Sequence, residues 1–489
     1  MTTITDAATA AVARLDKDLF IGGEWRPASG GGRFPVENPA TGEILCEVAD
    51  ATPEDGAAAL DSAAAAQPGW AAVPPRERGE ILRRAYEALI RRTDEVALLI
   101  TLEMGKSLPE SRAEVAYGAD YLRWFGEEAV RVAGEWKTGS AGDGRILTVR
   151  RPVGPALLIT PWNAPLAMLT RKIGPAVAAG CTTVVKPAAQ TPLTALLLAR
   201  LLTEAGLPPG VLNLVPTTAA GAVTEPLIAD RRLRKLSFTG STEVGRTLLR
   251  RAADNVLRTS MELGGNAPFI VCADADLDSA VDGAMVAKMR NLGEACIAAN
   301  RFLVHETVAD EFTRRLAARM SALTVGPGTD GSAAVGPLID ARQRDRVAGL
   351  VDDAVARGAQ LVCGGRPGPG AGYFYPPTVL ADVPAAARLT REEIFGPVAP
   401  ITTFGSDEQA LAMANDTEFG LVGYLFTRDL GRAVRMTEAL ETGMVGLNRG
   451  LVSDVAAPFG GIKQSGLGRE GGATGIDEYL ETQYVAVGL

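Results

Sequence analysis

Histidine is almost missing from this sequence, and cysteine is sparse. The 489 residues include one histidine, His305, so unless it is catalytic a general base must be a carboxylate, a lysine or a tyrosine. The five cysteines are far apart, odd in number and without Cys-x-x-Cys spacing, which argues against a disulfide framework and a cysteine-ligated zinc site. We therefore expect no metal site and a reducing, cytoplasmic location.

Long apolar runs and an excess of basic residues are also lacking. No stretch approaches the roughly 20 apolar residues that a membrane-spanning helix needs, and residues 1–20 do not have the pattern of a secretory signal. The net charge is −9, whereas nucleic acids and anionic membranes favour a basic face. We expect neither of them as a partner.

What is present describes a folded chain of two or three domains. Hydrophobic residues make up 47% of the sequence, and 489 residues exceed what one simple core accommodates. After a hairpin-like opening (FIGGEW, then ENPATGE), residues 75–131 predict long helices with breaks near Gly105 and Pro109. Residues 133–150 then change to glycine-containing, strand-like sequence and suggest an arm.

From residue 151 buried strands and helices alternate. This spacing predicts βαβ units, a parallel sheet and an α/β fold. A second α/β stretch follows 262–271 and continues to about 445, and the end of the chain (YVAVGL) is strand-like. The strands predicted in the first stretch are GPALLIT, TTVVKP, VLNLVP and KLSFTG, and its helices lie at about 165–179, 191–205 and from GSTEVG onward.

Three glycine patterns resemble phosphate-binding motifs, and only the first has the strand-to-helix context that phosphate binding needs. The segment 240–245 joins a strand to a helix, where backbone amides bind phosphate, but its G-x-x-x-x-G spacing is weak evidence alone. A literal G-x-G-x-x-G at 466–471 has no strand before it and indicates a loop. GKS at 105–107 is not a P-loop, because Ile100 stands where the first glycine belongs.

A candidate nucleophile is Cys296, which lies among small residues in NLGEACIAANR. A lone cysteine is more often a buried apolar residue, so its partners matter. Glu262 precedes a Gly-Gly pair in MELGGNAPFIV, which lets other groups come close, and Asn163 follows a buried strand in TPWNAP. A thiol, a carboxylate and an amide are together what covalent aldehyde oxidation needs.

Seven motifs in the same order resemble the aldehyde dehydrogenase superfamily over nearly the whole chain: TPWNAP, KPAAQTP, FTGSTEVG, MELGGNAPFIV, GEACIAANR, EEIFGPV and PFGGIKQSGLGRE. The resemblance implies that Cys296 is the nucleophile, that Glu262 activates water, and that Lys172 is a further catalytic residue. It implies an oxyanion hole made by the Asn163 side-chain amide and the Cys296 backbone N–H. The dinucleotide-binding residues that it implies are Thr160, Pro161, Trp162, Lys186, Ala189, Gly240, Ser241, Gly245, Leu263, Glu393 and Phe395.

The resemblance also implies the fold, namely a Rossmann-like cofactor domain, an α/β catalytic domain and a small β oligomerisation arm. Residues 1–132 and 151–262 would form the cofactor domain, 263–445 the catalytic domain, and 446–469 a return segment to the cofactor domain. The arm and tail would be residues 133–150 and 470–489, and they imply a homodimer or a homotetramer.

Within the superfamily the motifs are most similar to those of succinate-semialdehyde dehydrogenases, where Arg171, Arg290 and Ser453 match carboxylate-binding positions. Two guanidinium groups would hold a carboxylate by charge-assisted hydrogen bonds. We expect NAD(P)-dependent oxidation of succinate semialdehyde or a similar acidic semialdehyde. Glutarate semialdehyde, 2-oxoglutarate semialdehyde and unspecialised aliphatic aldehydes are the alternative substrates.

Four positions depart from patterns common in relatives. Ala189 stands where NAD-preferring relatives often carry a glutamate that repels a 2′-phosphate, so NADP is the predicted cofactor, with NAD as the alternative. Glu294 replaces a glutamine, and Ala298 replaces a second cysteine, so no local redox switch is expected. Arg449 adds a positive charge that is a candidate for tuning the acid pocket.

Two other functional classes fit the same motifs. A CoA-acylating relative would pass the thioester to a thiol and would need no water-activating base, so Glu262 argues against it. A catalytically silent structural protein on this fold would not need the complete set of Cys296, Glu262 and Asn163.

Overall fold

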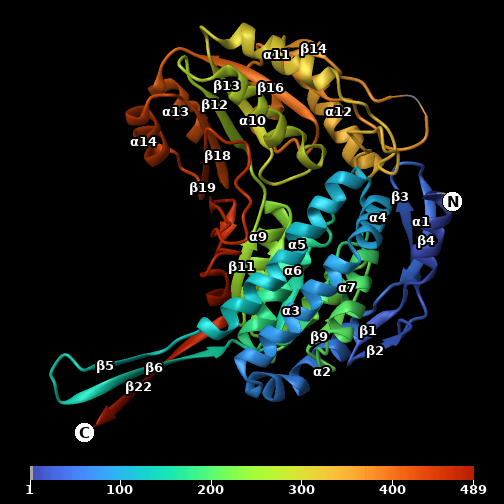
Figure 1. The fold of residues 1–489 in the computed structure, drawn as a ribbon, viewed down its shortest axis with the longest axis vertical. Helices are drawn as coiled ribbons and strands as arrows, with labels where there is room; N and C mark the ends of the chain where they lie inside the picture. The colour runs from blue at the N-terminus through green and yellow to red at the C-terminus, as the bar shows by residue number, and fades with distance from the viewer. Residues whose placement is uncertain (1–3, 369, 489) are drawn as a thin grey trace.

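Two large sheets organise the chain, and the computed structural model describes residues 4–368 and 370–488. The ends of the predicted 1–132 and 470–489 segments, residues 1–3 and 489, lie outside the described residues. Each sheet is covered by helices, and a strand-built arm projects from the lower unit (Figure 1). The predicted α/β architecture with a β arm is confirmed.

The first unit is built on an eight-stranded sheet whose central strands, from β9 to β11, run parallel. In spatial order its strands are β2 (Glu24–Arg26), β1 (Leu19–Ile21), β9 (Leu212–Leu214), β8 (Thr183–Lys186), β7 (Ala156–Ile159), β10 (Lys235–Thr239), β11 (Arg258–Glu262) and β21 (Gly466–Leu467). The predicted opening hairpin is β1–β2, and β1 joins the sheet by pairing with β9. The helices packed on this sheet are α2 (Pro53–Ala72), α6 (Ala167–Ala179), α7 (Leu193–Glu204), α8 (Ala220–Ala229) and α9 (Thr242–Ala253).

The predicted helical region at 75–131 forms α3 (Pro75–Arg91), α4 (Thr93–Met104) and α5 (Leu108–Glu128). Gly105 ends α4 in a left-handed conformation (φ 96°), as glycine at a helix C-terminus commonly does. Pro109 was predicted to break a helix, but it lies in the first turn of α5, where a missing N–H costs no hydrogen bond. An additional break occurs at Arg92.

The second unit is built on a seven-stranded sheet. In spatial order its strands are β14 (Gln360–Cys363), β15 (Thr378–Ala381), β16 (Val398–Phe404), β13 (Ala299–His305), β12 (Ala267–Val271), β18 (Val422–Phe426) and β19 (Met444–Leu447). Its helices are α10 (Leu277–Met289), α11 (Ala309–Ser321), α12 (Ala341–Ala356), α13 (Asp407–Asn415) and α14 (Leu430–Ala439). The remaining elements are α1 (Ile4–Ala13), β3 (Arg33–Asn38), β4 (Glu43–Ala49), β17 (Phe419–Gly420) and β20 (Ile462–Lys463).

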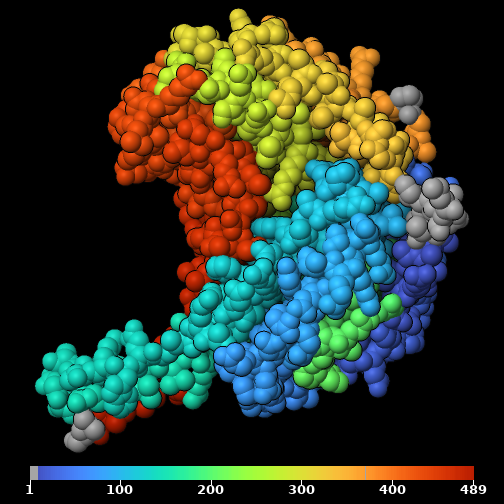
Figure 2. Space-filling model, viewed as in Figure 1, coloured from blue at the N-terminus to red at the C-terminus, as the bar shows by residue number. Residues whose placement is uncertain are grey.

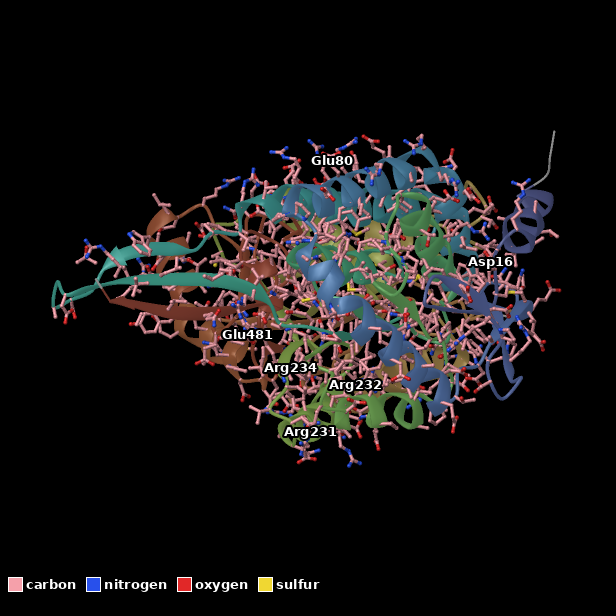
Figure 3. The ribbon with its side chains drawn as sticks, turned by 90° about the horizontal axis from the view of Figure 1, so that it is seen from below. Asp16, Glu80, Arg231, Arg232, Arg234 and Glu481 are labelled. Atoms are coloured by element: carbon pink, nitrogen blue, oxygen red, sulfur yellow. The ribbon has the colours of Figure 1, made fainter. Side chains whose placement is uncertain are left out.

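The arm is a three-stranded antiparallel sheet that stands clear of the body (Figure 2). Its strands are β5 (Glu135–Thr138), β6 (Gly144–Pro152) and β22 (Leu480–Gly488), so two segments far apart in sequence form one element. Glu481, labelled in Figure 3, pairs with Arg258 of β11 at 3.4 Å and ties the start of β22 to the first unit.

After β19 the chain returns from the second unit to the first, as Figure 1 shows in red. There β21 pairs with the end of β11, with Gly466 opposite Glu262. The glycine pattern at 466–471 therefore forms a short edge strand followed by turns. No helix within the described residues is long and apolar enough to cross a membrane.

Candidate active site

A cavity of about 310 Å³ lies where segments of both units meet, beyond the carboxyl ends of β7, β10 and β11. This is where ligands bind in parallel α/β sheets. Predicted site residues on its wall are Pro161, Trp162, Asn163, Arg171, Gly240, Ser241, Glu262, Leu263, Arg290, Cys296, Glu393, Phe395 and Ser453. Those that the structure does not place on the wall are Thr160, Lys172, Lys186, Ala189 and Gly245.

Cys296 lies in the loop between a short 3-10 turn, Arg290–Gly293, and β13. Burial, and next the nearby Glu262, raise the pKa of its thiol to about 12. The predicted role of the Gly-Gly pair has a geometric counterpart, because a Cβ at Gly265 would lie 2.5 Å from the Cys296 carbonyl oxygen. A side chain there would displace the loop that carries the predicted nucleophile (residues 294–298, the nucleophile loop).

The turn before this loop has an unusual backbone. Asn291 (φ 53°) and Leu292 (φ 57°) both adopt the left-handed region, which is costly for residues other than glycine. Glu110 of α5 holds the turn, since its Oε1 accepts the Asn291 backbone N–H at 2.6 Å. The Asn291 side-chain amide donates to the carbonyl oxygen of Asn163 at 2.9 Å.

Asn163 is buried and fixed at both ends. Its Nδ2 donates to the Glu294 carbonyl oxygen at 2.9 Å, and its own carbonyl oxygen accepts from Lys106 Nζ at 3.0 Å. Lys106 is itself paired with Glu114 at 2.5 Å. Because an amide nitrogen carries two hydrogens, Asn163 keeps one donor for a ligand in the cavity.

Glu262 ends β11 on the cavity wall and is almost fully buried. Burial, and next the nearby Glu470, raise the pKa of its carboxyl well above the ordinary value, and Arg171 and Lys172 oppose the shift. Among the described residues neither carboxyl oxygen has a hydrogen-bond partner. The carboxyl group is therefore free to bind a ligand or a water molecule.

Arg171 and Lys172 of α6 share one carboxylate, Glu470. Arg171 Nε lies 2.8 Å from Glu470 Oε2, and Lys172 Nζ bonds to Glu470 Oε1 and, at 2.9 Å, to Ser237. The Arg171 guanidinium stacks over Phe459 at 4.1 Å, and its buried Nη2 has no hydrogen-bond partner among the described residues. Arg171 therefore lines the cavity with one donor nitrogen uncommitted, whereas Lys172 lies behind it.

Arg290 and Ser453 meet at a more open part of the wall, where Arg290 Nη1 donates to Ser453 Oγ at 3.3 Å. The Arg290 guanidinium also lies over the Tyr117 ring at 5.9 Å. The three predicted substrate-binding residues thus line the same cavity as Cys296. Arg449 is exposed and is not on the cavity wall, so the structure places its charge outside this pocket.

Aromatic and polar groups line the other part of the cavity. The rings of Trp162 and Phe395 meet edge to face at 5.3 Å. Ser241 is the N-cap of α9, with its hydroxyl accepting from Val244 N at 3.4 Å. Glu393 accepts from Gly265 N at 3.2 Å, and burial raises its pKa to about 7.

Lys186 ends β8 beside β7, and the backbone N–H of Thr160 donates to its carbonyl oxygen at 3.1 Å. Its Nζ forms no ion pair with a described carboxylate, and burial lowers its pKa to about 8. A cation, a helix N-terminus and a carboxylate suit the phosphates and ribose hydroxyls of a dinucleotide. The residues present therefore fit such a cofactor.

Metal-ligating clusters, cysteine pairs and His305 are the remaining features of the described residues on which chemistry could depend. The described residues contain no cluster of His, Cys, Asp and Glu placed to hold a metal ion, and all five cysteines are free. His305 ends β13, bonds to Thr307 at 2.9 Å and does not line the cavity. A base in this cavity is therefore a residue other than histidine.

The fold and this site define an oxidoreductase, and the chain belongs to the aldehyde dehydrogenase family, whose model matches residues 25–485. It is 59% identical over 444 residues to succinate-semialdehyde dehydrogenase of Paenarthrobacter nicotinovorans, covering 91% of this chain and 99% of that protein. It is 48% identical to glutarate-semialdehyde dehydrogenase of Pseudomonas aeruginosa, covering 96% and 98%. The crystal structure of an Escherichia coli NADP-dependent enzyme matches it with a TM-score of 0.96 and 47% identity, covering 97% and 98%.

Some residues around the cavity were not singled out from sequence. Lys106 lies in the GKS segment, whose only sequence signal is a false P-loop, and Phe459 and Glu470 lie in the motif PFGGIKQSGLGRE, which predicts no role for either of them. Glu110 and Glu114 have no recognisable local pattern in the sequence. Their contacts join elements that are far apart in sequence: Glu110 accepts from Asn291 N, Glu114 accepts from Leu166 N, and the Phe459 ring lies under the Arg171 guanidinium.

Proposed function

We propose that the protein oxidises succinate semialdehyde, or a similar acidic semialdehyde, to the carboxylate with NADP or NAD. The observation that carries the substrate class is that Arg171, Arg290 and Ser453 line the cavity that also holds Cys296. Arg171 keeps Nη2 uncommitted at this wall, and a substrate carboxylate is an acceptor of matching charge.

The same cavity supports the proposed mechanism. The Cys296 thiolate attacks the aldehyde carbon, and the resulting oxyanion is held by Asn163 Nδ2 and the Cys296 backbone N–H. The nicotinamide supplies the hydride acceptor when it is bound near Trp162, Glu393 and Phe395. The thioester left on Cys296 is then hydrolysed by water that Glu262 deprotonates.

The nucleotide is proposed to be NADP in preference to NAD. Ala189 has no carboxylate to repel a 2′-phosphate, and Lys186 offers a cation on the neighbouring strand end. We propose that the first unit binds the dinucleotide through these residues together with Gly240, Ser241 and Gly245. Initial rates with both nucleotides test this, and a strong preference for NAD would contradict it.

The substrate class is best tested at Arg290. Replacing Arg171 would leave Glu470 with a buried, partly uncompensated charge, which typically destabilises a fold by several kcal/mol. Arg290 is exposed and has no such partner, so Arg290→Ala should fold normally. We expect kcat/KM for succinate semialdehyde to fall about 10- to 100-fold, the size of a lost charged hydrogen bond.

Butanal, a neutral aldehyde of equal length, is the matched control substrate, and its kcat/KM should change less than threefold, on the order of 0.6 kcal/mol. Ser453→Ala should also lower kcat/KM for succinate semialdehyde, by a smaller factor than Arg290→Ala. An equal loss for both aldehydes would contradict the carboxylate-binding role. Glutarate semialdehyde belongs in the same panel, because the similar protein of Pseudomonas aeruginosa is named glutarate-semialdehyde dehydrogenase.

A further inference from the structure

The carboxyl group of Glu294 is buried directly behind the nucleophile loop with little to bind. The side chain has no exposed surface, and it belongs to the residue two positions before Cys296. Its Oε1 accepts one hydrogen bond, from Ile339 N at 3.2 Å, and its Oε2 has no partner among the described residues. A carboxylate in such surroundings is poorly solvated.

The charged groups near Glu294 do not compensate it. Lys106 is the cation whose charge acts on the Glu294 carboxyl, but Lys106 Nζ is already bonded to Glu114 and to the Asn163 carbonyl oxygen. Asp340, at the N-terminus of α12 beside Ile339, is a like charge. Burial consequently raises the pKa of the Glu294 carboxyl well above its ordinary value.

The main chain of Glu294 also belongs to the oxyanion site. Its carbonyl oxygen accepts from Asn163 Nδ2 at 2.9 Å and from Asn291 Nδ2 at 2.8 Å. The side chain in turn attaches this peptide unit to Ile339. Movement of the Glu294 side chain would therefore move the group that orients Asn163.

We propose that Glu294 is a positioning residue that holds the nucleophile loop and Asn163 in place only as a neutral carboxylic acid. When it loses its proton to water at alkaline pH, the new carboxylate competes for Lys106. Lys106 then leaves the Asn163 carbonyl oxygen, and the oxyanion donor loses its orientation. The proposal builds on the family's aldehyde oxidation and adds an alkaline limit that this side chain sets.

Glu294→Gln tests the proposal, because glutamine has the same shape, keeps the acceptor for Ile339 N and cannot ionise. We measure kcat/KM from about pH 6 to about pH 10 with succinate semialdehyde and with butanal. The ratio of alkaline to neutral kcat/KM should rise at least about threefold in Glu294→Gln relative to the wild type. Titration of Cys296 is common to both proteins and cancels in this comparison.

Glu103 provides the matched control. It is also a fully buried glutamate, and burial raises its pKa to about 8, but it accepts from Leu193 N at 2.7 Å and Thr194 N at 2.9 Å on α7 and does not line the cavity. Glu103→Gln should leave the pH profile of kcat/KM unchanged. If both variants changed the profile equally, a general stability effect would explain it and the proposal would be wrong.

Thermal unfolding gives a readout that does not depend on turnover. A carboxyl group whose folded-state pKa is raised contributes stability below its unfolded pKa and loses it as pH rises to the folded value. As pH rises above about 4.5, the melting temperature of the wild type should therefore fall relative to that of Glu294→Gln. An unchanged alkaline-to-neutral ratio in Glu294→Gln would overturn the proposal.

Glu294→Leu is the second variant, neutral but without the acceptor for Ile339 N. It should also raise the alkaline-to-neutral ratio, even if its kcat is lower at every pH. If Glu294→Leu kept the alkaline-to-neutral ratio of kcat/KM of the wild type, the role proposed for the Glu294 charge would be contradicted. A wild type that oxidises no aldehyde at neutral pH would instead refute the proposed function, and the melting curves would still report on Glu294.

Discussion

At the scale of single residues, Cys296 and Glu262 influence each other's protonation. Both line one cavity, where Glu262 is buried and Cys296 is half-buried. The charge of Glu262 raises the pKa of the Cys296 thiol, so a thiolate and a Glu262 carboxylate are disfavoured at the same time. Arg171 lowers both pKa values and partly relieves this conflict.

Glu262→Gln separates the proposed role of Glu262 as the base for thioester hydrolysis from its effect on the pKa of the Cys296 thiol. Without a base at this position hydrolysis of the thioester should slow by roughly 10²- to 10⁴-fold. Oxidation of the first substrate molecule does not need that base, so we expect a burst of reduced nucleotide close to one equivalent of enzyme. Stopped-flow absorbance measures the burst, and Cys296→Ala should show none.

The same variant tests the coupling. Removing the Glu262 charge lowers the pKa of the Cys296 thiol, which increases its thiolate fraction at a given pH. In the absence of substrate, alkylation of Cys296 by iodoacetamide at neutral pH should therefore be faster in Glu262→Gln than in the wild type. Wild-type turnover together with an unchanged alkylation rate would show that Glu262 has neither role.

The sequence could name the residues proposed to react, but not the side chains that hold them in place. Cys296, Glu262 and Asn163 lie in contiguous motifs, and all three line the cavity. Lys106 and Glu110 come from the α4–α5 region and bond to main-chain atoms of the site. Such bonds have no sequence spacing that predicts them, because they form only when separate elements pack together.

At the scale of elements, the nucleophile loop depends on close backbone contacts. Gly265→Ala would place a Cβ 2.5 Å from the Cys296 carbonyl oxygen. The loop must then move, and a displacement on the order of 1 Å at reacting atoms can cost roughly 100-fold in rate. We expect kcat to fall by about that factor and the melting temperature to fall as well.

Gly349→Ala is the matched control in the middle of α12. A Cβ there meets no atom within 4 Å, and alanine favours a helix over glycine by about 0.5–1 kcal/mol. That variant should keep its kcat and unfold at the same or a higher temperature. Full activity in Gly265→Ala would show that the loop tolerates displacement.

The helices and strands predicted from hydrophobic periodicity are present in the structure, and the differences concern where they begin and end. The strands predicted at GPALLIT and KLSFTG are β7 and β10. Pro109 starts α5 instead of interrupting it, because proline is tolerated in a first helical turn. The place of the opening hairpin beside β9 was not predictable, since it depends on a pairing across almost 200 residues.

At the scale of the molecule, the arm is difficult to explain in an isolated chain. A three-stranded sheet without a covering layer has little core to stabilise it. Trp136 and Tyr484 are 59% and 61% exposed on it, which is unusual for large aromatic side chains. We infer that the arm packs on another copy, in a homodimer or a homotetramer.

Charge on the exposed arm should therefore separate the subunits. We expect light scattering after size exclusion to give two or four times 51.0 kDa for the wild type, and a shift toward 51.0 kDa for Trp136→Glu combined with Tyr484→Glu. Burying a carboxylate against an apolar partner costs several kcal/mol, enough to dissociate a moderate interface. Leu430→Glu, at a side chain 77% exposed on α14, is the control and should leave the mass unchanged. A wild type that already runs at 51.0 kDa would mean that the arm serves a purpose other than assembly.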